Sequence, residues 1–126
     1  MLGIPVKAEL KALHSPDVRD LRSFVPRDED CFRVFVEAMI GPEGDDSSES
    51  FGIIVCSPKA LAEEAASGPV LGRHRVIMAS FDYNTLTSTI RAFCGQCEGE
   101  SWDEVGSKVA RLGFWEFEDY REYEAP

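Results

Sequence analysis

The chain has 126 residues, 44% of them hydrophobic, which is enough for one domain, residues 1–126, with a single core and no need of disulfides or metal. Its 13 basic and 23 acidic residues give a formal net charge of −10. This balance argues against nucleic acids and anionic membranes as partners, because both are bound through clustered Lys and Arg. With no signal peptide and no apolar run of about 18 residues, we expect a cytoplasmic protein whose four cysteines are mainly reduced.

The first half of the chain predicts three strands. Apolar and charged residues alternate over residues 6–12, which indicates a half-buried strand. Residues 31–40 form the clearest strand, and residues 41–50 follow it as a loop rich in Gly, Asp and Ser. Residues 51–56 then return as the second strand of a long-looped hairpin. The apolar face of the first strand is expected to consist of Val6, Ala8, Leu10 and Ala12.

Helix signals follow the hairpin. Ser57 and Pro58 begin a helix that runs to about residue 66, because Ser caps free N–H groups and Pro is tolerated at the first helical position. Residues 74–81 form a further strand. Asp82 can cap a second helix, which two glycines weaken and end before residue 100.

A third helix begins at a capping box. Ser101 stands at the cap and Glu104 follows three residues later. Gly113 is expected to take the left-handed conformation that ends such a helix. Residues 114–126 alternate in part and fit either a strand or a helix. The order of elements predicts an α+β fold, with an antiparallel sheet of about four or five strands and helices packed on one face.

Cys94 and Cys97 form a CxxC pair, which could bind zinc or carry out redox chemistry. No other ligand pair stands at the right spacing, and the motif falls at the end of a helix, where the dipole does not favour a thiolate. His14 and His74 are the only histidines, and no nucleophile elbow, zinc-protease motif or phosphate-binding loop occurs. We therefore assign no catalytic residue, metal ligand or cofactor. A small cysteine-dependent enzyme and a zinc-stabilised accessory protein remain the alternatives.

The carboxy-terminal segment, residues 98–126, concentrates acidic and aromatic residues. It contains nine acidic and three basic residues, and its net charge of −6 is more than half that of the chain. Aromatic rings supply buried area at protein interfaces, while carboxylates steer and pair with Arg or Lys of a partner. The competing interpretation is that the rings belong to the core and the acids only face water. The rings of this segment are Trp102, Phe114, Trp115, Phe117, Tyr120 and Tyr123.

Several short motifs, taken in order, resemble one known family. The most distinctive stretch has Cys, Cys, Gly, Ser, Trp, Glu and Val at positions 94, 97, 99, 101, 102, 104 and 105, then Gly-x-Trp-Glu-Phe-Glu-Asp-Tyr at 113–120. Lys-Ala-Glu-Leu at 7–10, Ser-Pro-Asp at 15–17, Ile-Gly-Pro at 40–42, Ser-Phe at 50–51, Val-Cys-Ser-Pro at 55–58, Gly-Arg-His at 72–74 and Phe-Asp-Tyr at 81–83 complete the pattern. In these motifs the chain resembles the immunity protein 8 family of bacterial polymorphic toxin systems.

The resemblance implies an α+β protein that is made beside a secreted toxin and protects its producer. Such proteins bind and block the active domain of the toxin, often a nuclease. A nuclease attracts phosphate with a basic site, so an acidic inhibitor can occupy that site by charge mimicry. The resemblance assigns no residue of this chain to the contact and no oligomeric state.

We accordingly predict an immunity protein that neutralises a cognate toxin by stoichiometric binding, with a basic surface on the toxin as the complement. The contact residues come from the acidic hairpin loop and from the acid–aromatic segment. They are Asp45, Asp46, Glu49, Trp102, Glu116, Glu118, Asp119 and Glu122.

Overall fold

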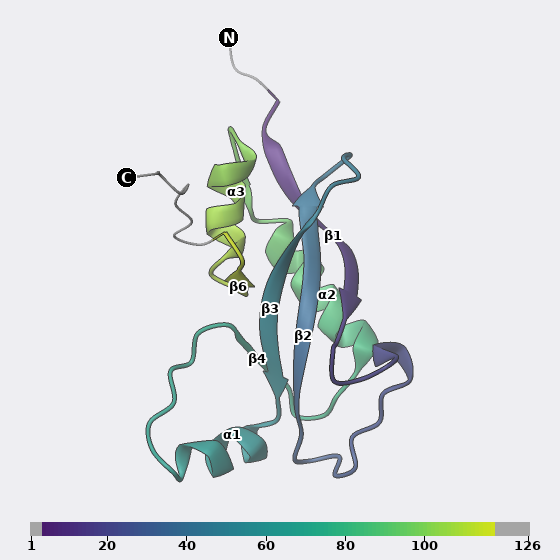
Figure 1. Ribbon diagram of the computed structural model, residues 1–126, viewed down its shortest axis with the longest axis vertical. Coiled ribbons are helices and arrows are strands. Elements are labelled where there is room, and N and C mark those ends of the chain that lie inside the picture. The colour runs from purple at the N-terminus through teal and green to yellow at the C-terminus, as the bar shows by residue number, and fades with distance from the viewer. Residues whose placement is uncertain (1–3, 118–126) are drawn as a thin grey trace, which may run out of the picture.

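The computed structural model describes residues 4–117 as one sheet with three α-helices and a short 3-10 helix (Figure 1). The strands are β1 (Val6–His14), β2 (Arg33–Pro42), β3 (Glu49–Cys56), β4 (Arg75–Ile77), β5 (Glu98–Gly99) and β6 (Phe114–Trp115). The helices are η1 (Leu21–Ser23), α1 (Pro58–Ala65), α2 (Tyr83–Cys94) and α3 (Trp102–Val109). The predicted α+β class is therefore confirmed.

The sheet is mixed, whereas the sequence predicted a purely antiparallel one. Its order is β4-β3-β2-β1-β5, and β6 pairs with the first half of β3 on the same edge as β4. β4 runs parallel to β3, with Ile54 opposite Arg75. Parallel neighbours require a crossover connection. Residues 57–74, which contain α1, provide that crossover and bring the chain back beside the second half of β3 (Figure 1).

A β-bulge in β1 changes which residues face the core. Leu10 lies opposite Ile40, but Ala12 lies opposite Met39, so Lys11 is an extra residue in the ladder. A shift of one residue moves the following side chains to the other face of a strand. Leu13 therefore packs against the core, and Ala12, predicted to be on the inner face, is exposed.

The core lies between one face of the sheet and helices α2 and α3. Alternate residues of β2 and β3 supply the sheet side, and Leu86, Ile90, Val105 and Val109 of the two helices supply the other. All of these helix residues are fully buried, as expected for apolar residues at helical spacing. The sheet residues are Val34, Val36, Ala38, Ile40, Phe51, Ile53 and Val55.

Helix α1 differs from the other two because it buries none of its own residues. It lies beyond the end of the sheet, below the strands in Figure 1. Glu64 fastens it to β4 through two hydrogen bonds from Arg75, of 2.9 and 3.0 Å. These bonds hold the pKa of Glu64 below its usual value. The prediction of helices on one face thus describes α2 and α3, while α1 is attached at the margin.

The helix starts agree with the local signals in the sequence. The side chains of Ser57, Asp82 and Ser101 each accept a hydrogen bond from the backbone N–H three residues later. Of the strand predicted at residues 74–81, only three residues form a strand, β4. His74, just before it, has a φ of 61°. Gly113 does not have the predicted left-handed conformation. A Cβ there would stand 3.0–3.2 Å from atoms of β3, so close packing explains this glycine.

None of the helices in the described part of the chain has the length and apolar character that a membrane crossing requires.

Candidate functional site

Glu49, the first residue of β3, joins three distant parts of the chain. Its carboxylate accepts hydrogen bonds from the indole N–H of Trp102, at the start of α3, and from that of Trp115, in β6. The second bond measures 2.9 Å. Both indole donors are thereby satisfied at the edge of the core, where an unpaired donor would cost free energy. This Glu49 bridge ties the hairpin to the carboxy-terminal elements.

Trp115 packs closely against β3 and α3. Its ring stacks on Phe51 at a centroid distance of 5.8 Å and an interplanar angle of 15°. The edge of its six-membered ring faces Gly106 of α3, where a Cβ would come within 2.7 Å of the indole. A glycine inside a helix costs about 1 kcal/mol relative to alanine. The close approach of the indole to α3 explains why that cost is tolerated at this position.

The residues around Trp115 are exposed rather than buried. Phe114 is 60% exposed and Phe117 43% exposed, so neither is a core ring. Glu116 points back to the hairpin and accepts a hydrogen bond of 3.2 Å from the N–H of Ser50. The end of the described chain therefore presents apolar and acidic side chains together, beside the start of β3.

The loop between β2 and β3 is held in a defined shape. Asp45 accepts a hydrogen bond of 2.8 Å from the N–H of Ser47, which holds the pKa of this carboxyl below its usual range. Lys11 donates to the backbone oxygen of Asp45 at 2.6 Å. Gly44 has a φ of 82°, a conformation that favours glycine. Asp46 is exposed at the tip and is therefore available for contact with a partner.

The strand register brings the acidic segments to one end of the sheet. The start of β1 pairs with β5 and with the end of β2, and the start of β3 pairs with that same end of β2. Helix α3 begins there too, and Figure 1 shows these segments together at the top. We call this region the acidic end. Its carboxylates are Glu9, Glu43, Asp45, Asp46, Glu49, Glu98, Glu100, Asp103, Glu104 and Glu116.

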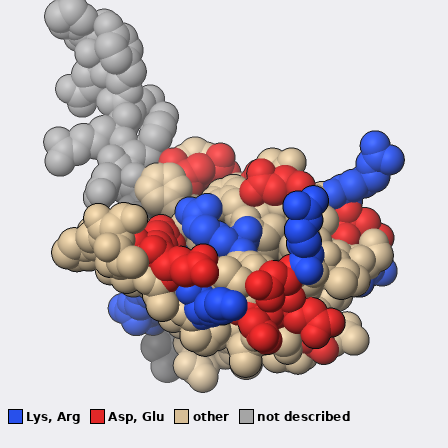
Figure 2. Space-filling model, turned by 90° about the horizontal axis from the view of Figure 1, so that it is seen from below, with Lys and Arg blue, Asp and Glu red and all other residues tan. Residues whose placement is uncertain are grey.

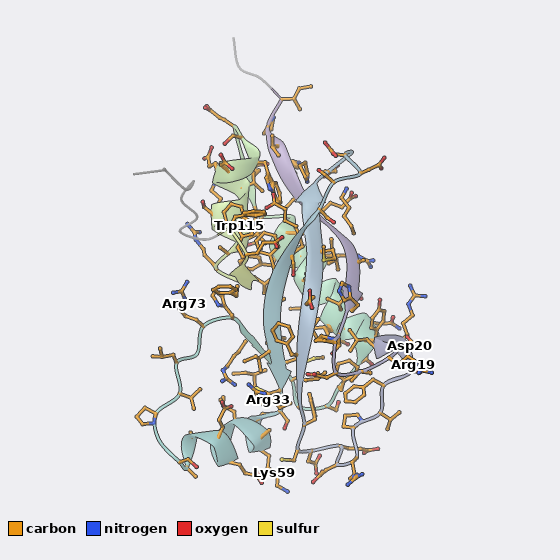
Figure 3. All side chains as sticks on the ribbon, viewed as in Figure 1. Arg19, Asp20, Arg33, Lys59, Arg73 and Trp115 are labelled. Atoms are coloured by element: carbon orange, nitrogen blue, oxygen red, sulfur yellow. The ribbon has the colours of Figure 1, made fainter. Side chains whose placement is uncertain are left out.

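Few cations offset this charge. Lys7, Lys11 and Lys108 lie at the acidic end, and the last two are within 4.0 Å of Glu9 and Glu104, respectively. Arg111, just after α3, is a fourth cation, and it acts on Cys97 beside β5. The opposite end of the molecule is different: Figure 2 shows Lys and Arg side chains between acidic ones. Labelled examples there are Arg33 and Lys59 (Figure 3). The negative charge of the described chain is therefore concentrated at one end.

The structure places five of the eight predicted contact residues together. Asp45, Asp46, Glu49, Trp102 and Glu116 all belong to the acidic end. Within this group, Glu49 and Trp102 also bond to each other. Glu118, Asp119 and Glu122 lie outside the described residues. Sequence reasoning missed two contacts: Ser50 as the partner of Glu116, and Gly106 as the residue against which Trp115 packs. A serine carries no signal for such a bond, whereas a glycine inside the predicted third helix could have indicated close packing there.

The cysteines are free and mostly buried. Burial raises the pKa of the Cys94 thiol to about 12 and also raises that of Cys97, so both favour the protonated form. The N–H of Cys97 bonds to the oxygen of Cys94 at 2.9 Å as the chain leaves α2. His74 donates to the backbone oxygen of Ala110 at 2.8 Å. In residues 4–117, no group of three or more His, Cys, Asp or Glu side chains is arranged to hold a metal ion.

These features describe a small α+β protein with an ordered, strongly acidic end. The comparison with known families then gives the identity: the model of the family described as Immunity protein 8 matches residues 8–120. The chain belongs to the immunity protein 8 family. Membership implies that it acts in toxin immunity, with a cognate toxin as its partner. No curated protein and no solved structure matches the chain.

Proposed function

We propose that this immunity protein neutralises its toxin by stoichiometric, non-catalytic binding through the acidic end. The observation that supports the proposal is that the start of β3 after the hairpin loop, the first turn of α3 and Glu116 meet around the Glu49 bridge. Carboxylates gathered in this way complement a basic surface and accelerate the encounter with it. The encounter is expected in the cytoplasm of the producing cell.

Apolar surface lies next to these charges. Phe114 and Phe117 are exposed beside Glu116, and Trp102 is half-buried at the start of α3. Interfaces combine a central aromatic anchor with a polar rim. In this proposal the exposed rings supply buried area, while the carboxylates pair with Arg and Lys of the toxin. A nuclease active site is the basic surface that fits this chemistry best, because it must itself attract phosphate.

The test compares two charge reversals in exposed turns at opposite ends. Asp46→Lys alters the acidic end, and Asp30→Lys is its matched control in the turn where Asp28 accepts a hydrogen bond of 2.9 Å from the N–H of Asp30. The toxin is the secreted protein encoded beside this gene, used as its isolated carboxy-terminal domain. Affinity is measured by calorimetry at low and high salt.

The proposal expects Asp46→Lys to weaken toxin binding at least about tenfold and to reduce its dependence on salt. Asp30→Lys is expected to bind like the unaltered protein. Equal affinities for the two variants would place the contact elsewhere. A molar ratio far below one at full neutralisation would contradict stoichiometric inhibition.

A further inference from the structure

Helix α2 carries a stripe of polar residues that lies outside the acidic end. Tyr83, Thr87 and Arg91 stand four residues apart and so share one face of the helix. This face lines two adjoining hollows, of about 520 and 220 Å³. The larger is within the range of small-molecule sites, which is roughly 300–1,000 Å³. The groove lies between α2, η1 and β1, on the side where Figure 3 labels Arg19 and Asp20.

Two guanidinium groups line both hollows. Arg22 of η1 lies over the ring of Tyr83, 5.7 Å from its centroid, and Arg91 approaches from the far end of the α2 stripe. Within residues 4–117 neither arginine lies within 4.0 Å of a carboxylate. In a protein of net charge −10, a pair of such arginines in one hollow is the reverse of the general charge pattern.

The acidic residues of the groove are engaged in backbone contacts. Asp20 accepts a hydrogen bond of 3.0 Å from the N–H of Arg22 as the cap of η1. Asp82 accepts one of 2.9 Å from the N–H of Thr85 as the cap of α2. Arg22 also interacts with the Tyr83 hydroxyl and with Asp20, and both raise its pKa. A guanidinium group has five N–H donors, so Arg22 and Arg91 still keep donors for an external anion.

The remaining walls suit an organic group. Phe24 and Phe81 meet edge to face at a centroid distance of 5.0 Å, and both line the larger hollow with the Tyr83 ring. Polar donors at one side and aromatic rings at the other are the usual composition of a site for a small ligand. Guanidinium groups bind phosphate through paired, charge-assisted hydrogen bonds.

We propose that this groove binds a small organic phosphate of the nucleotide class. The phosphate lies between Arg22 and Arg91, and the ring system lies against Phe24 and Phe81. The groove adjoins the acidic end at Lys11, which lines the smaller hollow and donates to the backbone oxygen of Asp45. Its arginines and rings belong to other segments, so it is a second binding function of the protein rather than part of the toxin contact. Its loss leaves toxin neutralisation unchanged, and the Asp46→Lys variant leaves phosphate binding unchanged.

The test titrates adenosine monophosphate, as the probe, into the full chain and follows the backbone amide signals by NMR. Saturable shifts are expected at Arg22, Tyr83, Thr87 and Arg91. Adenosine at the same concentration, which lacks the phosphate, is expected to give none. Arg91→Gln should weaken binding about tenfold or more, since it removes a charge-assisted bond. Arg19→Gln removes the same charge from an exposed residue that does not line the hollows, and it should bind normally.

Three results would overturn the proposal. Adenosine could shift the same amides as strongly as its phosphate, or Arg19→Gln could weaken binding as much as Arg91→Gln. Alternatively, an acidic peptide could saturate these amides while adenosine monophosphate does not, which would assign the groove to a protein segment. For each variant, the amide spectrum also reports whether the protein is folded.

Discussion

The Glu49 bridge predicts a large stability loss from one small substitution. Glu49→Gln keeps the size of the side chain but offers one carbonyl oxygen and an NH₂ group to two indole donors. One indole N–H then faces another donor. A hydrogen bond to a charged group contributes about 1.5–3 kcal/mol, and an unsatisfied buried donor costs about 1–3 kcal/mol.

The bridge is at the edge of the core, since Trp115 is 7% exposed while Glu49 and Trp102 are half-buried. The lower part of those ranges therefore applies, and we expect a loss of about 2 kcal/mol in the free energy of unfolding. For a domain of this size, that lowers the melting temperature by roughly 6–10 °C. Urea unfolding followed by circular dichroism measures the loss, and tryptophan fluorescence should change at the same midpoint.

Glu43→Gln is the matched control, because it removes the same charge from an exposed position in the loop that precedes β3. It should change the stability by no more than about 0.5 kcal/mol. A double-mutant cycle with Trp115→Phe, which removes the indole N–H, should give a coupling energy of about 1 kcal/mol with Glu49→Gln. If the two Gln variants unfold at the same urea concentration, the bridge does not stabilise the fold.

Three further predictions concern other contacts. Gly106→Ala should lower the free energy of unfolding by about 1–3 kcal/mol despite the better helix propensity of Ala, because the added Cβ comes 2.7 Å from the Trp115 indole. A variant that is more stable in urea unfolding would show that the ring moves freely. Glu64 has a lowered pKa in the folded state, so its bond to Arg75 stabilises the fold above the usual carboxyl pKa of 4.5 and loses that effect as pH falls through the lower folded value. Glu64→Gln should flatten the stability profile on that acid side, and an unchanged profile would contradict the assignment. In native protein a thiol reagent at neutral pH should label the half-exposed Cys31 first. Cys94, whose pKa is about 12, should react only after unfolding. Rapid labelling of Cys94 in the native protein would support the alternative of a cysteine-dependent enzyme.

The features that sequence could predict are those set by neighbouring residues. The caps at Ser57, Asp82 and Ser101 involve bonds over three residues, so short motifs specify them. The family resemblance was confirmed because it depends on the order of many such motifs. The α+β class followed from the alternation and helical spacing of apolar residues.

The features that sequence could not predict depend on contacts between distant residues. The bulge at Lys11 and the parallel placement of β4 are decided by how strands meet, and nothing in their local sequence specifies it. Glu49 was selected for its charge, yet its indole partners lie 53 and 66 residues further along the chain. Gly113 was expected to take a left-handed conformation at the end of the third helix, whereas its glycine is explained by β3, which leaves no room for a side chain.

The most direct test of toxin binding through the acidic end is amide hydrogen exchange of the protein with and without its toxin domain. We predict slower exchange on binding at residues 43–50 and 99–104, and no change at residues 26–31 and 58–66 of the opposite end. Protection confined to that opposite end, with the hairpin loop exchanging as in the free protein, would contradict the account.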